Sequence, residues 1–264
     1  MNWKTYYQEH LTTAEGAVKK IKSGDRVVVA HACGEPSHLL EAMVANADAY
    51  RNVEIVHMVA MGKGEYCKPE YADNFRHNAF FVGGSTRDAI AEGRGDFTPS
   101  FFFEIPRQFS TTMPVDVAMV MVTPPDENGM CSLGVSVDYT LEAVKQAKLV
   151  IAQVNPQMPW TGPHSLVSVD ELDCIVEYEA PLIELAPPKI GEVEKAIGEH
   201  CASLVPDGAT LQLGIGAIPD AVLLFLKGKK DLGIHSEMFS DGVVELAEAG
   251  VITNAQKTLN PGKF

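Results

Sequence analysis

The sequence predicts an α/β protein made of two related open α/β units, the second of which is incomplete. Three observations lead to this prediction. Short apolar runs of strand length alternate with helical stretches, which is typical of βαβ units and a mostly parallel sheet. A pattern of strand, turn and proline occurs twice, and the second copy is followed by far less chain. We therefore expect a domain at residues 1–185 and the start of another at residues 186–264.

The first unit begins with a helix that Thr12 or Thr13 caps and that continues to about Lys22. Residues 26–30 form an apolar run that predicts a buried strand, and Pro36 marks the start of the next helix. Further strands are expected at residues 53–59, 79–82, 115–123, 149–154 and 174–178.

The internal repeat sets residues 23–36 against residues 206–219. Both segments follow a helical stretch, and both pass from a strand through a turn to a proline that opens an apolar helix. The prolines around residues 181–188 mark a stiff joint between the two copies. On this repeat logic the second unit lacks roughly a hundred residues of its first-unit counterpart, and we expect its sheet to have an uncovered edge or to be completed by another chain.

The composition excludes several function classes. The chain has 264 residues with 21 Lys+Arg against 35 Asp+Glu, a net charge of −14 that argues against nucleic-acid binding. Its apolar runs are much shorter than the ~20 residues that span a bilayer, so no membrane partner is expected. Five scattered cysteines without a C-x-x-C pair, and a start without an apolar signal core, predict a cytoplasmic location.

A glycine-containing loop, Gln212-Leu213-Gly214-Ile215-Gly216, follows the first predicted strand of the second unit. Its glycines allow backbone N–H groups to approach an anionic or oxyanionic group at the start of the next helix. The loop lacks the third glycine of a dinucleotide fingerprint. A tight turn without a ligand explains the residues equally well, so both interpretations stay open.

Glu237 falls just beyond the predicted strand at residues 232–235, at the sheet edge where open α/β proteins bind ligands. Its apolar neighbours Met238 and Phe239 predict a partly desolvated carboxylate, which is a stronger nucleophile or base. Asp241-Gly242 supplies a turn before the following helix. The alternative is that Glu237 caps that helix or faces water.

His31 occupies the matching place in the first unit, where a structural role is the alternative to a functional one. The remaining histidines at His57, His77 and His164 have no partners at metal-ligand spacing, so we expect no metal site.

Together these motifs resemble a known family. Residues 124–136, residues 154–159, the loop at 212–219 and the stretch Ile234-His235-Ser236-Glu237-Met238-Phe239-Ser240-Asp241-Gly242 are similar to the family I coenzyme A transferases. The resemblance covers essentially the whole chain. It lies in the acetyl-CoA hydrolase/transferase branch, which includes 4-hydroxybutyrate and butyryl-CoA:acetate CoA-transferases.

The resemblance implies a ping-pong exchange of CoA between a short-chain acyl-CoA and a carboxylic acid such as acetate. Glu237 would be the nucleophile and would carry CoA as a glutamyl thioester. CoA enters as a substrate, and no permanently bound cofactor is implied. The resemblance also implies a homo-oligomer and places these residues at the substrate and CoA sites: His31, Gly34, Glu35, Gln212, Gly214, Gly216, Asp241 and Gly242.

Two alternatives stay open beside the transferase. An acyl-CoA hydrolase would use the same scaffold with water as the acceptor, and an incomplete fragment would only bind CoA or a partner chain. Two departures from the family bear on this choice. Trp160 stands after Met158-Pro159 where relatives often have a basic residue, and the sequence ends at Phe264, ahead of a glycine-rich CoA-binding segment of the family.

Overall fold

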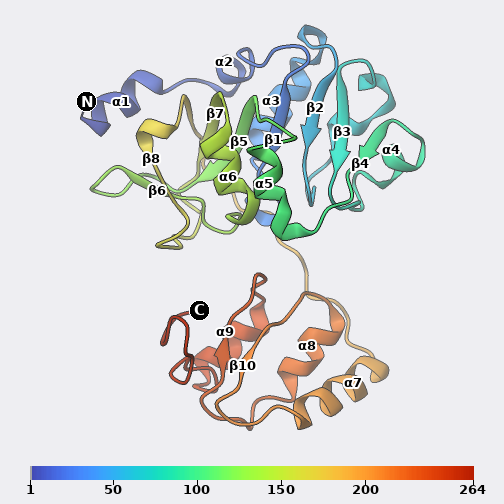
Figure 1. The fold of residues 1–264 in the computed structure, drawn as a ribbon, viewed down its shortest axis with the longest axis vertical. Coiled ribbons are helices and arrows are strands. Elements are labelled where there is room, and N and C mark those ends of the chain that lie inside the picture. The colour runs from blue at the N-terminus through green and yellow to red at the C-terminus, as the bar shows by residue number, and fades with distance from the viewer. Residues whose placement is uncertain (1) are drawn as a thin grey trace. The chain divides into compact units, whose positions relative to one another are not determined.

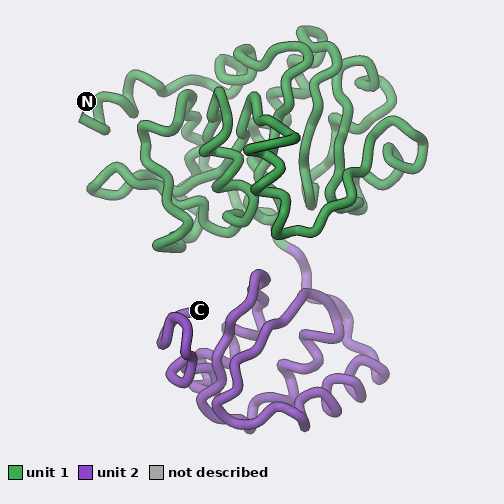
Figure 2. Tube along the Cα trace, viewed as in Figure 1, with its two compact units in different colours: residues 1–184 green, residues 185–264 purple. Residues whose placement is uncertain are grey.

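The computed structural model describes residues 2–264, which fold as two compact units that divide between residues 184 and 185 (Figure 2). Each unit is an α/β structure with parallel strand pairs, and the predicted α/β class is therefore confirmed. None of the helices in the described residues is long and apolar enough to cross a membrane.

Unit 1 is built on a seven-stranded parallel sheet in the order β4-β3-β2-β1-β5-β7-β9 (Figure 1). Its strands are β1 (Arg26–Val29), β2 (Val53–Val56), β3 (Phe75–Ala79), β4 (Gly95–Phe97), β5 (Val117–Val122), β7 (Leu149–Val154) and β9 (Cys174–Glu177). A separate antiparallel pair joins β6 (Met130–Ser132) to β8 (Leu166–Ser168). The chain adds β2, β3 and β4 on one side of β1 and then β5, β7 and β9 on the other side. The strand order therefore reverses between β1 and β5.

The helices of unit 1 cover both faces of the sheet. They are α1 (Trp3–His10), α2 (Ala14–Val18), α3 (Ser37–Ala45), α4 (Arg87–Ala91), α5 (Ile105–Phe109) and α6 (Asp138–Gln146). One core places α2 and α3 against alternate residues of β1, β5 and β7, such as Ile151. The other core places α5 and α6 against the opposite residues, such as Val120 (Figure 1). This alternation follows from the two-residue period of a strand.

The strand predicted at residues 79–82 lies earlier in the chain, as β3 at Phe75–Ala79. The strand contains polar residues, so a search for apolar runs did not detect it. These polar side chains have hydrogen-bond partners in the fold. The Asn78 amide donates to Glu54 Oε1 at 2.7 Å, and Asn78 Oδ1 accepts from Thr98 Oγ1 at 2.8 Å. Phe81, which belonged to the predicted strand, is exposed beyond the end of β3.

Unit 2 repeats the opening of unit 1 on a smaller scale. It contains α7 (Glu192–Ser203), β10 (Thr210–Leu211), α8 (Ala217–Leu224), β11 (Gly233–Ile234) and α9 (Asp241–Glu248). β10 pairs in parallel with β11, as β1 pairs with β2. A Cβ on Gly198 would lie 2.7 Å from the Ala221 backbone, so this glycine lets α7 pack closely on α8.

Tyr139 ties α6 to the ends of two strands of unit 1, and its side chain is almost fully buried. Its hydroxyl donates to the Val29 carbonyl at 2.6 Å and accepts from the Met58 N–H at 3.4 Å. Tyr139→Phe leaves both backbone groups without this partner, so we expect unfolding free energy to fall by about 1–2 kcal/mol. Chemical denaturation measures this loss, and Tyr71→Phe, at a half-buried tyrosine, is the control. An unchanged midpoint for Tyr139→Phe would contradict the expectation.

Candidate functional site

The segment after β1 lies where the strand order of unit 1 reverses, a position at which open α/β sheets commonly bind ligands. In open α/β sheets, ligands bind beyond the carboxyl ends of the strands where the order reverses. His31, Gly34 and Glu35 follow β1 directly, and Ala32–Gly34 form a short 3-10 helix before α3. Three predicted site residues therefore share this position within unit 1.

His31 is held by contacts from the opposite side of the reversal. Its backbone N–H donates to Ser136 Oγ at 3.0 Å, and its Nε2 lies 2.6 Å from Asp138 Oδ2. The ring packs on Tyr139 with a centroid distance of 4.9 Å. When Nε2 carries the proton and donates to Asp138, the neutral ring has a lone pair on Nδ1. This Nδ1 atom is buried and has no hydrogen-bond partner in the described residues. The arrangement orients one ring nitrogen and leaves the other available.

Gly34 is required by packing. A Cβ at this position would lie 2.5 Å from Ser136 Cβ. The glycine therefore lets the segment after β1 approach the chain that leads into α6. Its role in this structure is to bring His31 and Glu35 close to the end of the sheet.

Glu35 is buried, with 3% of its surface exposed. The Gly62 N–H donates to Glu35 Oε2 at 3.0 Å, and Ser37 Oγ donates to Glu35 Oε1 at 3.3 Å. A Cβ on Gly62 would lie 2.0 Å from Oε1, so only glycine permits this approach. Burial raises the pKa of the Glu35 carboxyl, and the Gly62 N–H opposes part of that rise.

A chain of buried polar side chains continues behind Glu35. His57 Nε2 lies 3.6 Å from Glu35 Oε2, and His57 Nδ1 lies 2.8 Å from the Tyr66 hydroxyl. The Tyr66 ring in turn lies 5.6 Å from the His77 ring. Burial holds the pKa of His57 well below its usual range and lowers that of His77 to about 4. Sequence spacing missed this cluster, because the fold alone brings these distant residues together.

The neutral state of buried His77 predicts an acid sensitivity. Between pH 6.5 and the folded pKa of about 4, the unfolded state binds a proton at His77 that the folded state refuses. The free energy of unfolding therefore falls as the pH is lowered through this window, by up to about 1.4 kcal/mol per pH unit for one such group. His77→Asn retains a donor for the Ile55 carbonyl, and we expect it to flatten the pH dependence of unfolding. Denaturation midpoints across this window test it, with exposed His164→Asn as the control. An equal slope in both variants would contradict the prediction.

The raised pKa of Glu35 predicts the opposite trend. Below its ordinary pKa of 4.5 the carboxyl is protonated in both the folded and unfolded states. As the pH rises, the unfolded carboxyl ionises first, so folded-state stability is lost up to the folded pKa. Glu35→Gln removes this loss and keeps an acceptor for the Gly62 N–H. We expect the variant to exceed the wild type in unfolding free energy at neutral pH and to match it below pH 4.5. Exposed Glu9→Gln is the control, and a wild-type curve for Glu35→Gln would refute the expectation.

In unit 2, the loop after β10 has one glycine that the backbone requires. Gly216 precedes α8 with φ 115° and ψ 178°, a conformation that favours glycine. Around Gly214 no atom of the neighbouring described structure lies within 4 Å of an added Cβ, so packing does not explain this glycine. Gln212 is exposed just beyond β10.

Ser236 fastens the second predicted loop of unit 2 to the first. Its hydroxyl donates to the Leu213 carbonyl at 2.8 Å, and the Leu213 N–H donates back to it at 3.3 Å. Glu237 follows directly and therefore lies beyond the carboxyl end of β11, next to the glycine loop. This contact brings Glu237, Gln212 and Gly214 to one edge of the small sheet.

The structure corrects one expectation about Glu237. Its side chain is exposed, so its own loop does not supply the partial desolvation that Met238 and Phe239 predicted. Phe239 is itself 54% exposed and packs on the Phe264 ring with a centroid distance of 5.5 Å. Phe239 thus packs on the C-terminal residue of the chain.

The remaining predicted residues mark the start of α9. Asp241 is its first residue and is exposed, and it lies close enough to Asp220 to add to the burial that raises the pKa of that carboxyl. A Cβ on Gly242 would lie 2.8 Å from Leu223 Cδ1, so Gly242 allows α9 to pack on α8. For Gly242 the structure shows a packing role.

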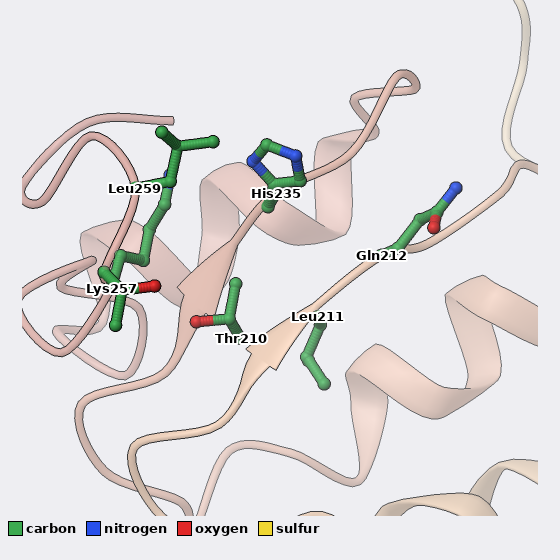
Figure 3. A pocket seen from close by; sticks show the side chains of 7 residues that line it. Thr210, Leu211, Gln212, His235, Lys257 and Leu259 are labelled. Atoms are coloured by element: carbon green, nitrogen blue, oxygen red, sulfur yellow. The ribbon is translucent and has the colours of Figure 1, made fainter.

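A hollow of about 340 Å³ opens beside the two strands of unit 2 (Figure 3). Figure 3 shows His235, Lys257 and Leu259 around β11 and Gln212 just past β10. Lys257 is 6% exposed, and its ammonium group donates to the Lys263 carbonyl. Across residues 2–264, no group of three His, Cys, Asp or Glu side chains is arranged to hold a metal ion.

An open parallel sheet with polar residues at its strand ends defines a protein of the ligand-binding α/β class. The sequence profile of the acetyl-CoA hydrolase/transferase N-terminal domain matches residues 1–185. The chain therefore belongs to the acetyl-CoA hydrolase/transferase family.

Individual relatives agree with this assignment. The chain is 62% identical to the 4-hydroxybutyrate coenzyme A transferase of Clostridium kluyveri, covering 100% of this chain and 62% of that protein. It is 36% identical to the butyryl-CoA:acetate CoA-transferase of Anaerostipes caccae, covering 98% of this chain and 60% of the relative. The crystal structure of 4-hydroxybutyrate CoA-transferase from Porphyromonas gingivalis superposes with a TM-score of 0.88 at 39% identity, covering 99% and 62%. The chain thus spans about three fifths of these relatives.

Proposed function

We propose that the protein acts as a CoA-transferase that moves CoA between a short-chain acyl-CoA and a carboxylic acid such as acetate. The observation that carries the proposal is the position of Glu237. It is a solvent-accessible carboxylate at the carboxyl end of β11, fastened by Ser236 beside the glycine loop, in a chain of this family. The names of the relatives support butyryl-, 4-hydroxybutyryl- and acetyl-CoA as candidate substrates.

In the proposed reaction, the Glu237 carboxylate attacks the thioester carbonyl of the acyl-CoA. The C–S bond breaks, leaving an acyl-glutamyl anhydride and CoA thiolate. The thiolate then attacks the glutamyl carbonyl and expels the first acid as its carboxylate, so that CoA is held as a glutamyl thioester. A second carboxylate reverses these steps and leaves as its CoA ester. The anhydride retains the energy of the thioester for as long as water is excluded.

Each unit contributes candidate residues to this proposal. In unit 2, the unhindered backbone at Gly214 and Gly216 offers N–H groups to an oxyanion or to part of CoA, with Gln212, Asp241 and Gly242 close by. In unit 1, His31, Gly34 and Glu35 are proposed for the acyl group. We assign residues 1–185 as the N-terminal CoA-transferase domain and residues 186–264 as the start of the C-terminal one. A cytoplasmic location and a homo-oligomer remain predictions.

A second candidate is acyl-CoA hydrolysis on the same scaffold. The exposed side chain of Glu237 favours it, because water then reaches any glutamyl thioester that forms. The two functions are separated by supplying acyl-CoA with and without acetate. Transfer gives a new CoA ester only when the acid is present, whereas hydrolysis gives free thiol at a rate independent of acetate.

Replacing the proposed nucleophile tests both candidates. Glu237→Gln removes the attacking carboxylate at nearly constant size, so we expect exchange to fall by at least about a thousandfold. Borohydride should trap a glutamyl thioester in the wild type and none in the variant, as mass spectrometry of the peptide would report. Glu245→Gln, an exposed glutamate on α9, is the matched control and should exchange normally. Wild-type exchange by Glu237→Gln would remove this residue from the mechanism.

A further inference from the structure

Unit 1 contains a cavity of about 170 Å³ under the start of α3, at the carboxyl ends of β5 and β7. Its lining includes Glu35, Ser37, His38, Met121, Gln153 and Tyr178. Gln153 lies on the same face of β7 as the core residue Ile151, the face that α3 covers. The cavity is formed by unit 1 alone, and of the residues proposed above for the acyl group its lining includes Glu35.

The side-chain oxygen of Gln153 is a buried acceptor that residues 2–264 leave without a hydrogen bond. Its side chain is only 1% exposed, and the buried Oε1 has no hydrogen-bond partner in the part of the chain that the structure describes. A buried acceptor without a partner costs about 1–3 kcal/mol. Native proteins rarely accept that cost without a bound water, a ligand or a functional reason. Gln153 therefore points to an occupant that donates a hydrogen bond.

The walls of the cavity are held in place without an occupant. The His38 and Tyr178 rings stack with centroids 3.7 Å apart and planes 6° apart. Beyond Tyr178, the Asn155 side chain donates to the Ala180 carbonyl at 2.8 Å and accepts from its N–H at 3.3 Å. These contacts fix the segment that covers the cavity, so the space is preformed and a ligand does not need to open it.

Charge limits which part of a ligand enters. The cavity has two acidic side chains, Glu35 from the segment after β1 and Glu41 from α3. Glu41 is paired with Lys63 at 2.8 Å, whereas Glu35, above its pKa, which burial raises, repels a carboxylate. The ligand therefore enters with an uncharged end, and an end that bears O–H satisfies Gln153 Oε1. The volume of about 170 Å³ suits a chain of about four carbons, because an engineered cavity of about 150 Å³ holds benzene.

We propose that this cavity binds the hydroxyl end of a short ω-hydroxyacyl group, with Gln153 Oε1 accepting its hydrogen bond. The assignment rests on the proposed CoA-transferase function and makes Gln153 a specificity-determining residue. It distinguishes a hydroxylated chain from an alkyl chain of equal length, because the alkyl chain leaves the buried amide unpaired.

The first arm of the test measures binding independently of catalysis. The 264-residue chain is titrated with 1,4-butanediol and with 1,2-dimethoxyethane, which has the same number of non-hydrogen atoms but no O–H donor. The side-chain amide signal of Gln153 is identified in a ¹⁵N NMR spectrum by its loss in Gln153→Leu. We expect the diol to shift this signal and the diether to leave it in place. A signal that neither compound moves means that the cavity holds an adventitious water only, and overturns the proposal.

The second arm measures specificity. With one acyl-CoA donor, exchange is followed for 4-hydroxybutyrate and for pentanoate, in which a methyl group replaces the hydroxyl. Gln153→Leu should lower kcat/KM for 4-hydroxybutyrate about tenfold and leave pentanoate within about twofold. Gln146→Leu, an exposed glutamine on α6, is the matched control, and Gln153→Met replaces Gln153→Leu if the latter unfolds early. Equal losses for both acids would reduce Gln153 to a structural role and overturn the proposal.

The two arms separate the failure of this inference from failure of the proposed function. If the wild type exchanges neither acid while the diol shifts Gln153, the transferase proposal fails and the hydroxyl-binding cavity stands. If exchange proceeds normally and the diol does not shift Gln153, the function stands and the cavity assignment fails.

Discussion

The reversal of strand order between β1 and β5 is the constraint on which the rest of unit 1 depends. The connections that follow β1 and β5 run toward opposite edges of the sheet. No helical crossover therefore covers the ends of both strands. The segment after β1 occupies that space. Its glycine, Gly34, lets it approach Ser136, and the approach carries His31 to Asp138 and Glu35 to Gly62. Tyr139 then joins both sides through the Val29 carbonyl.

Polar groups buried at this point need hydrogen-bond partners, and the partners that each group has explain its pKa shift. Glu35 is stabilised by one backbone N–H and one hydroxyl, which together offset only part of its desolvation, so its pKa stays raised. His57 and His77 avoid a similar cost by remaining neutral. His57 and His77 each keep a buried Nε2 without a hydrogen-bond partner in the described residues. Gln153, which cannot change its protonation, keeps a buried Oε1 without one beside the cavity.

Much of the architecture was predictable from the sequence, and the failures have physical causes. The apolar runs that became β5 and β7 are continuous because strands covered on both faces need no polar alternation. β3 broke the rule, since Asn78 and His77 are buried with partners that only the fold supplies. His31 and Glu35 could be named as candidates because they follow a strand end. His57, Tyr66 and Gln153 were missed, because the contact of His57 with Tyr66 and the cavity beside Gln153 form only in three dimensions.

The two strand-end glutamates show how one architecture produces opposite environments. Glu35 is enclosed because Gly62 and α3 pack over it, whereas Glu237 follows a two-residue strand and is exposed. A hydrated carboxylate is a weak nucleophile, so the proposed reaction needs a source of desolvation beyond the loop of Glu237 itself. In the proposed reaction the substrate would provide one, because an acyl-CoA bound against the unhindered backbone at Gly214 would displace water from the neighbouring carboxylate. Ser236 holds the two loops together, so the groups proposed to bind and to attack lie on adjacent loops.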